Sequence, residues 1–437
     1  MTLETAQKLL QENHQEQILR FWDRLDANER NALLAQIETF DFAAINRMRA
    51  LLKAAPQDTP RHECPPAPVE ELSGAARAQA AAHGRDLIKA GRAGVLLVAG
   101  GQGSRLGFDG PKGAYPVGPI KDRTLFFYHA RKVLALDKAY GVRIPFYIMT
   151  SETNDEATRE HFRQNGFFGL PEEDVFFFVQ GMWPALDPEG KIILDRPGHV
   201  FMSPDGHGGT LSALAASGAI EDMEKRGVDT LFFFQVDNPM VEICDPAFLG
   251  LHDLRGADIS IKVCAKREPS EGLGIVVKRA DGRYGMVEYS ELTPEQMNRR
   301  TISGALYYRF GSVAIHVFSR AFLKREALGE MPLHIAHKKI PYCAEDGSTV
   351  KPEKPNACKF EKFIFDVLPD AQTVVNLAFD RNEEFSPVKN AEGKDSPESC
   401  RMDLMAKWMR RLREASRELP PMPFGIDPVH PLTPERD

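Results

Sequence analysis

The chain has 437 residues, of which 43% are hydrophobic and 27% are charged, as in ordinary globular proteins. Its formal net charge is -7 and it has no long basic run, which argues against nucleic acid as the main ligand, because that binding needs clustered Lys and Arg. No apolar stretch approaches the roughly 20 residues of a membrane span, the N-terminus lacks a signal-peptide core, and the six cysteines form no CxxC pair, so we expect a cytoplasmic protein with free thiols and no membrane partner.

The first 54 residues have a helical pattern. Asp26 is expected to cap one helix, with Glu29 as its capping-box partner three residues later. Asp41 is expected to cap the next helix. Residues 55–70 contain five prolines, which is typical of a linker or of a strap over the surface. We therefore assign residues 1–70 to an N-terminal helical region and a proline-rich linker.

From residue 94 onward, short apolar runs predict buried strands: VLLVA, PFYIMT, DVFFFV and TLFFFQV. Amphipathic stretches at 124–139, 152–165 and 209–226 lie between them, which favours a mostly parallel sheet covered on both faces. Later runs, ADISIKVC, LGIVVK, GALYYRF and SVAIHVF, have fewer helices between them and indicate added antiparallel strands. The prediction is a mixed-sheet α/β domain over 71–390.

The last part of the chain, 391–437, is expected to hold one short helical region at 397–417. The proline-rich tail that follows, LPPMPFGIDPVHPLTP, is expected to be extended along the surface or disordered.

The stretch GVLLVAGGQGSRLGFDGPKGAYPVG, from Gly94 to Gly118, passes directly from an apolar strand into a glycine-rich loop. Glycines let the backbone adopt positive φ and approach a ligand closely, and successive N–H groups can then hold an anion. The Rossmann fingerprint GxGxxG fails because Leu106 stands where its third glycine should be. The Walker A pattern fails because Lys112 precedes Gly113 rather than Ser or Thr. A strand, a glycine turn and two cations, Arg105 and Lys112, suit a triphosphate better than a dinucleotide.

The same stretch resembles the signature of the UDPGP type 1 family, the uridylyltransferases that make UDP-sugars, and most of all their eukaryotic-type UDP-N-acetylglucosamine pyrophosphorylases. Further segments match in order, among them IPFYIMTSET, FFFVQGMWPALDPEGKIIL, MSPDGHGGTLSALAASGAIEDMEKRG, QVDNPMVEICDPAFLG, VEYSEL, HKKIPY, KPEKPNACKFEKFIFDV and EFSPVKNAEGKDSPESCR. The resemblance covers roughly residues 15–400, so it is far more specific than a lone glycine motif.

The resemblance implies a Rossmann-like, GT-A-like nucleotidyltransferase core and a reaction of the EC 2.7.7 type. UTP and a sugar 1-phosphate, both small molecules, would give a UDP-sugar and pyrophosphate. Such chemistry depends on positioning and charge neutralisation, and the anionic nucleophile needs no general base. The resemblance gives Arg105, Lys112 and Lys389 catalytic roles on the phosphates.

It also implies the remaining site residues. Asp237, at the end of an apolar strand, would bind a Mg²⁺ cofactor, which often needs few protein carboxylates beside substrate phosphates. The nucleotide would be held by Val98, Ala99, Gly100, Gly101, Lys112, Gln180, Gly206 and Asp237, and the sugar by His207, Gly274, Glu288, Arg309 and Ser312.

Three departures bear on the sugar and on the chain's extent. His207 stands where the N-acetylglucosamine enzymes usually carry Asn, and the family's NAGN stretch reads RFGS at 309–312, so Arg309 and Ser312 replace two asparagines. Only 47 residues follow Asn390, so the family's further C-terminal region is expected to be absent or replaced.

We therefore expect N-acetylglucosamine 1-phosphate as the sugar substrate, with glucose, galactose or a broad set as the alternative. A non-catalytic sugar-nucleotide sensor is the alternative of another class, and a nicotinamide dehydrogenase is a distant third because the fingerprint it needs is missing.

Overall fold

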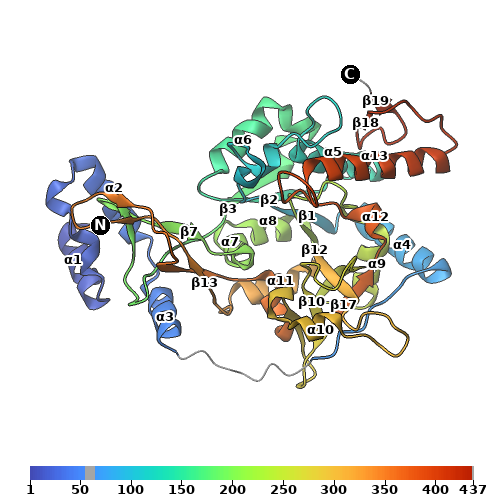
Figure 1. Ribbon diagram of the computed structural model, residues 1–437. Coiled ribbons are helices and arrows are strands. Elements are labelled where there is room, and N and C mark those ends of the chain that lie inside the picture. Colours follow the sequence, from blue (N-terminus) through green and yellow to red (C-terminus); the bar gives the residue numbers. More distant parts are fainter. Residues whose placement is uncertain (55–63, 436–437) are drawn as a thin grey trace. The chain divides into compact units, whose positions relative to one another are not determined.

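The computed structural model describes residues 1–54 and 64–435. The chain forms two compact units, each built from separate segments (Figure 1). The first unit comprises 1–63, 181–209 and 331–364, and the second comprises 64–180, 210–330 and 365–437. This division does not follow the boundaries at 70 and 390 expected from the sequence. The physical reason is a shared core: the N-terminal helices bury Leu10, Leu33 and Ile45 together with Leu186 and Phe360 from the two later segments.

In its described residues, the first unit combines three α-helices with short antiparallel strand pairs. The expected caps are confirmed, since Asp26 and Glu29 form a capping box and Asp41 caps the following helix. The strands pair β4 with β7, β5 with β6, β13 with β16 and β14 with β15. The elements are α1 (Leu3–Glu12), α2 (Ala27–Glu38), α3 (Phe42–Lys53), β4 (Met182–Pro184), β5 (Leu194–Arg196), β6 (His199–Val200), β7 (Met202–Pro204), β13 (His334–Lys338), β14 (Tyr342–Cys343), β15 (Thr349–Val350) and β16 (Ala357–Glu361).

The second unit is built around a seven-stranded mixed sheet, which confirms the expected α/β class. The strand order is β17-β9-β12-β8-β1-β2-β3. Every neighbouring pair is parallel except those of β12, which runs antiparallel to both β8 and β9. The strands are β1 (Ala93–Val98), β2 (Phe146–Thr150), β3 (Val175–Val179), β8 (Thr230–Gln235), β9 (Ile259–Ala265), β12 (Phe310–Ser319) and β17 (Val374–Ala378).

Helices cover both faces of this sheet. One face packs Val95, Leu97, Phe232 and Phe234 against four helices, α4 (Gly74–Lys89), α5 (Leu125–Tyr140), α9 (Pro246–Leu254) and α13 (Pro397–Glu414). The opposite face carries Tyr147, bonded to Asp222 of α8 (Ala219–Arg226), and Phe318, stacked on Phe322 of α11 (Arg320–Ala327). The other helices are α6 (Asp155–Gln164), α7 (Thr210–Ala216), α10 (Pro294–Asn298) and α12 (Arg381–Glu384), and two small sheets pair β10 (Ile275–Lys278) with β11 (Tyr284–Val287) and β18 (Gly425–Ile426) with β19 (Pro434–Glu435).

The structure corrects two of the secondary-structure predictions. The run GALYYRF is not a strand: Gly304 has φ +83° and closes a turn in which Thr301 and Ala305 are bonded, and β12 begins only at Phe310. The amphipathic stretch 209–226 is two helices because Gly218, with φ +80°, ends one and caps the next.

The proline-rich regions also differ from a plain surface coil. In the part of the linker that the structure describes, 64–70, Pro66 bridges Val277 and Glu70 bridges Leu377, as a strap would; residues 55–63 lie outside the described chain. The C-terminal tail is anchored at its middle, because Phe424 and Ile426 are buried in the core that α5 and α13 share, while most of its other described residues are exposed or half-buried.

Candidate functional site

One edge of the central sheet gathers most of the expected site residues. The carboxyl ends of β1, β2, β3 and β8 meet there because these strands are parallel. The amino end of β12 lies at the same edge because β12 runs the other way. In α/β proteins, ligands bind outside the carboxyl ends of the strands. We therefore expect a ligand to lie near the residues that come just after β1, β3 and β8 and near those that begin β12.

The glycine-rich loop after β1 is closed by its own backbone. The Lys112 N–H donates to the Gly101 carbonyl (3.0 Å) and the Gly103 N–H donates to the Gly110 carbonyl (2.9 Å). Asn154, at the N-terminus of α6, is buried, and its Nδ2 donates to the carbonyls of Ala99 (3.0 Å) and Gly101 (3.2 Å). These bonds fix the path of the loop without using its glycine N–H groups at 100 and 101. Sequence reasoning missed Asn154, whose only signal was its place just beyond the end of β2.

Two glycines of this region have close neighbours, and at Gly113 the packing leaves room only for glycine. A Cβ on Gly100 would lie 2.9 Å from Oε1 of Gln180, so the Gln180 amide lies directly against the loop. A Cβ on Gly113 would lie 2.1 Å from the ring of Phe126, which explains why no Ser or Thr of a Walker motif follows Lys112. Gln180 itself is buried at the end of β3, where its N–H donates to the Thr150 carbonyl (2.9 Å).

Lys112 and Asp237 meet at the centre of this edge. The Lys112 ammonium lies 3.6 Å from a carboxylate oxygen of Asp237, and the two side chains are only 17% and 14% exposed. Asp237 follows β8, and Lys112 comes from the far side of the glycine loop. Arg105, by contrast, is exposed on the one-turn 3₁₀ helix Ser104–Leu106 and forms no hydrogen bond or ion pair with the described residues. The structure thus brings Lys112, but not Arg105, into contact with Asp237.

The segment that carries Lys389 lies at the same edge. The Val388 N–H donates to the Asp237 carbonyl (2.8 Å). The buried Asn238 side chain donates to the Glu384 carbonyl (2.7 Å) and accepts from the Ser386 N–H (3.1 Å). The segment that carries Lys389 is therefore bonded to Asp237 and Asn238, just beyond the end of β8. Asn238 is a second positioning residue that the sequence did not identify.

A buried ion pair anchors the start of that segment. Lys262 of β9 is completely buried and contacts both carboxylate oxygens of Glu384 at 2.6 Å and one of Asp245 at 3.0 Å. Burial alone would lower the pKa of Lys262, but the two carboxylates outweigh it and raise the pKa above its ordinary value. The ammonium is therefore charged and holds α12 to the sheet.

Three of the residues expected around the sugar lie together beside β12. The Ser312 N–H donates to the Gly274 carbonyl (2.8 Å), and a Cβ on Gly274 would lie 3.0 Å from Oε1 of Glu288. Glu288 is half-buried and forms a capping box with Glu291. Arg309 precedes β12 and is exposed, with its guanidinium 4.8 Å from the centre of the Phe310 ring.

Gly206 and His207 belong to the first unit. Gly206 has φ +86° and a Cβ there would lie 2.4 Å from the Lys362 carbonyl oxygen, so only glycine fits. His207 stacks on Phe363 (5.4 Å between ring centres), and its Nδ1 accepts the Ile364 N–H (3.1 Å). This bond leaves the ring proton of a neutral His207 on Nε2.

The described residues hold no group of three or more His, Cys, Asp or Glu side chains placed to bind a metal ion. A preformed, all-protein metal cage is therefore missing from this part of the chain. The donor set at the sheet edge is instead one carboxylate, Asp237, which suits a Mg²⁺ ion that takes its other ligands from phosphates and water.

Comparison with known proteins agrees with this geometry. Residues 59–414 match the family model described as UTP–glucose-1-phosphate uridylyltransferase, UDPGP. The human UDP-N-acetylhexosamine pyrophosphorylase-like protein 1 is 39% identical, over 96% of this chain and 89% of that protein. The Saccharomyces cerevisiae UDP-N-acetylglucosamine pyrophosphorylase is 34% identical, over 91% of this chain and 88% of its own.

Among solved structures, the Trypanosoma brucei UDP-N-acetylglucosamine pyrophosphorylase in complex with an inhibitor superposes with a TM-score of 0.82 at 27% identity, covering 94% of this chain and 87% of that one. No helix in 1–54 or 64–435 is both long and apolar enough to cross a bilayer. With a family model matched over most of its length and relatives above 30% identity, the chain belongs to the UDPGP family of uridylyltransferases.

Proposed function

We propose that this enzyme transfers the uridylyl group of UTP to N-acetylglucosamine 1-phosphate. The observation that carries the proposal is the meeting of Lys112, Asp237 and the closed glycine loop at the carboxyl edge of the sheet, with Gln180 against that loop. A cation, a carboxylate and unused backbone N–H groups within one small region are what a triphosphate and its metal need. We infer the identity of the sugar from the names of the relatives in yeast and Trypanosoma brucei.

In the proposed reaction, a phosphate oxygen of the sugar 1-phosphate attacks the α-phosphorus of UTP in line. The bond between the α-phosphorus and the bridging oxygen to the β-phosphorus breaks, and pyrophosphate leaves. Lys112 and Lys389 neutralise the charge that grows on the leaving group, and Arg105 moves onto it from its exposed position when UTP binds. Gln180 offers one donor and one acceptor to the uracil edge.

Asp237 would hold Mg²⁺, which when bound supplies charge neutralisation for the phosphate oxygens. In its absence Lys112 is the partner of Asp237. The same lysine can therefore turn from Asp237 to a phosphate once a metal takes its place. The six free cysteines fit a reducing compartment, and we infer that the enzyme works in the cytoplasm.

The test is pyrophosphate release from UTP with a panel of sugar 1-phosphates. The proposal expects release that requires Mg²⁺ and is fastest with N-acetylglucosamine 1-phosphate. Fastest release with glucose 1-phosphate would establish the alternative sugar, which the replacements at 207, 309 and 312 favour. Binding of UTP with no release for any sugar would identify a sensor instead of an enzyme.

A further inference from the structure

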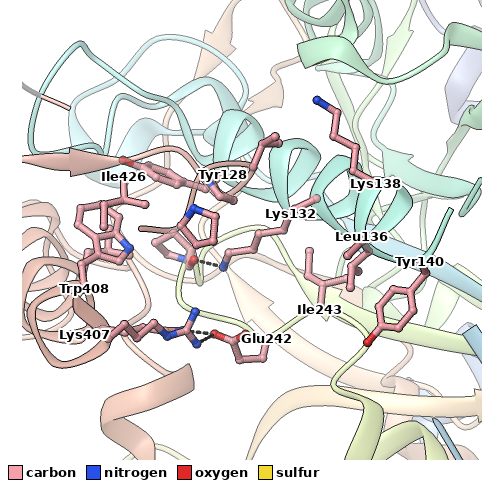
Figure 2. A pocket seen from close by; sticks show the side chains of 18 residues that line it. Tyr128, Lys132, Leu136, Lys138, Tyr140, Glu242, Ile243, Lys407, Trp408 and Ile426 are labelled. Atoms are coloured by element: carbon pink, nitrogen blue, oxygen red, sulfur yellow. Dashed lines mark hydrogen bonds and ion pairs between the residues drawn. The ribbon is translucent and has the colours of Figure 1, made fainter. Parts of the chain in front are cut away.

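A cavity of about 530 Å³ lies within the second unit (Figure 2). Its walls come from α5, between Tyr128 and Tyr140, and from the loop after β8, α13 and the C-terminal tail. None of the residues that line it was assigned above to the nucleotide, the sugar or the metal. Its volume falls within the range of small-molecule pockets in proteins, about 300–1,000 Å³.

Positive charge is in excess in this cavity. Glu242 accepts hydrogen bonds from both Lys407 and Arg411, the latter at 2.5 Å. Lys132 donates to two backbone carbonyls, those of Pro239 (2.5 Å) and Val241 (2.7 Å), and no described carboxylate pairs with it. Three cations are therefore gathered around one carboxylate, which pairs with only two of them, while Lys138 points away from the cluster in Figure 2.

This excess has an electrostatic cost in the protein alone. Burial, together with the neighbouring Lys407 ammonium, lowers the pKa of Lys132 to about 7. The pKa of Lys407 is lowered as well, by burial first, although Glu242 opposes that shift. A bound anion would favour the charged form of both lysines, because an opposite charge within a few ångströms raises the pKa of an ammonium group.

The rest of the lining is apolar and aromatic. Figure 2 shows Trp408 and Tyr140 on opposite sides of Lys132, with Ile243 and Leu136 between the lysine and Tyr140. Aromatic faces and aliphatic side chains take up the flat ring of a ligand, while ammonium groups take up its phosphate. The cavity therefore offers apolar and aromatic side chains for the ring of such a ligand and ammonium groups for its phosphate.

We propose that this cavity is a second ligand site, which binds a small phosphorylated ring compound with its phosphate at Lys132 and Lys407 and its ring against the aromatic and aliphatic side chains of the lining. The wall that Lys132 holds is Pro239–Glu242, which begins two residues after Asp237. Occupancy therefore changes turnover at Asp237. This coupling rests on the proposed uridylyl transfer, whereas the binding does not.

The binding is tested with 1-naphthyl phosphate on the full-length chain by equilibrium dialysis, with and without saturating UTP and Mg²⁺. We expect saturable binding that UTP leaves unchanged, and binding of 1-naphthol that is weaker by about tenfold or more, the loss of one charge-assisted contact. Displacement of 1-naphthyl phosphate by UTP would place it in the catalytic site and overturn the proposal, as would the lack of saturable binding.

Two variants distinguish the contribution of the Lys132 charge from that of the open volume of the cavity. Lys132→Met removes a cation without leaving a carboxylate unpaired, and Ala135→Phe fills the cavity while keeping every charge. Each variant is expected to bind 1-naphthyl phosphate about tenfold or more weakly than the wild type. The control Lys138→Met is expected to bind it like the wild type. Wild-type affinity in both test variants would overturn the site.

The coupling is read from turnover with UTP and N-acetylglucosamine 1-phosphate as 1-naphthyl phosphate is added. A change in kcat that Ala135→Phe abolishes supports it, and an unchanged kcat at saturating 1-naphthyl phosphate overturns it. If the wild type has no uridylyltransferase activity, the proposed function fails, and the dialysis result decides the binding site on its own.

Discussion

The Lys112 ammonium and the Asp237 carboxylate face each other at 3.6 Å, joining the glycine loop after β1 to the end of β8. Neither residue has another described ion-pair partner, so each is available to a ligand of opposite charge. In the proposed reaction both residues act on the phosphates of UTP. Lys112 would contact the phosphates directly, and Asp237 would hold the metal ion. Their contributions can be measured separately, because a substitution of Asp237 removes only the anion and a substitution of Lys112 removes only the cation.

Replacing Asp237 by Asn keeps the size of the side chain but removes its charge. We expect turnover at saturating UTP to fall by about 10²-fold or more, because the carboxylate that would hold Mg²⁺ is lost. The backbone carbonyl that accepts the Val388 N–H is kept, so the fold should survive, as circular dichroism would show. Near-normal turnover at saturating Mg²⁺ would exclude Asp237 as the metal ligand.

Replacing Lys112 by Ala should cost about 3 kcal/mol of transition-state stabilisation, the usual effect of removing one fixed electrostatic donor. UMP lacks the outer phosphates and should bind the wild type and the variant about equally. The measurements are kcat/KM for UTP and the Kd of UMP. An equal loss of UMP binding would mean that the Lys112 side chain maintains the shape of the loop, through its ion pair with Asp237.

Asn154→Asp keeps the acceptor for the Ser151 N–H but removes the two N–H donations to Ala99 and Gly101. It also turns a carboxylate oxygen toward two carbonyls in a buried place, so we expect a loss of about 1–3 kcal/mol in the free energy of unfolding and a raised KM for UTP. The control is Gln102→Ala, which removes an exposed bond to the Thr153 carbonyl. If both variants bind UTP equally well, Asn154 does not position the loop.

The sequence predicted the strands and caps of this chain well because their signals are local. Apolar runs gave the buried strands, and Asp26 with Glu29 forms the expected capping box. The positioning residues Asn154 and Asn238 could not be found this way, since what they bond is set by strand order rather than by spacing. The same holds for the N-terminal helices, whose core partners follow much later in the chain.

The lowered pKa of Lys132 predicts a pH dependence of stability. Its pKa is about 7 in the folded state, mainly through burial, and near 10.4 when unfolded. Between these values the unfolded chain binds more protons, so the free energy of unfolding should rise as pH increases through this window. Urea unfolding at pH 7, 8 and 9 measures the slope. Lys132→Met should flatten it, and an identical slope in the variant would show that Lys132 keeps an ordinary pKa.

The last prediction concerns the choice of sugar. Gly274, Glu288 and Ser312 lie together beside β12, but Ser312 and Arg309 stand where the resembling enzymes carry asparagines. Asn offers both a donor and an acceptor, whereas Ser is shorter and Arg only donates. A site built to bond an acetamido group rejects a sugar without it by leaving polar atoms unpaired.

With those bonds altered, discrimination between N-acetylglucosamine 1-phosphate and glucose 1-phosphate should be weak, about 10-fold in kcat/KM rather than thousands. The pair Arg309→Asn and Ser312→Asn, introduced together, should raise the ratio in favour of the acetamido sugar. A wild-type ratio above about 10³ would mean that other side chains have rebuilt the pocket, since a site built to bond such a group rejects a substrate without it by about 10⁴–10⁵. Because Glu288 can accept from two hydroxyls in either sugar, Glu288→Gln should slow both and leave their ratio unchanged.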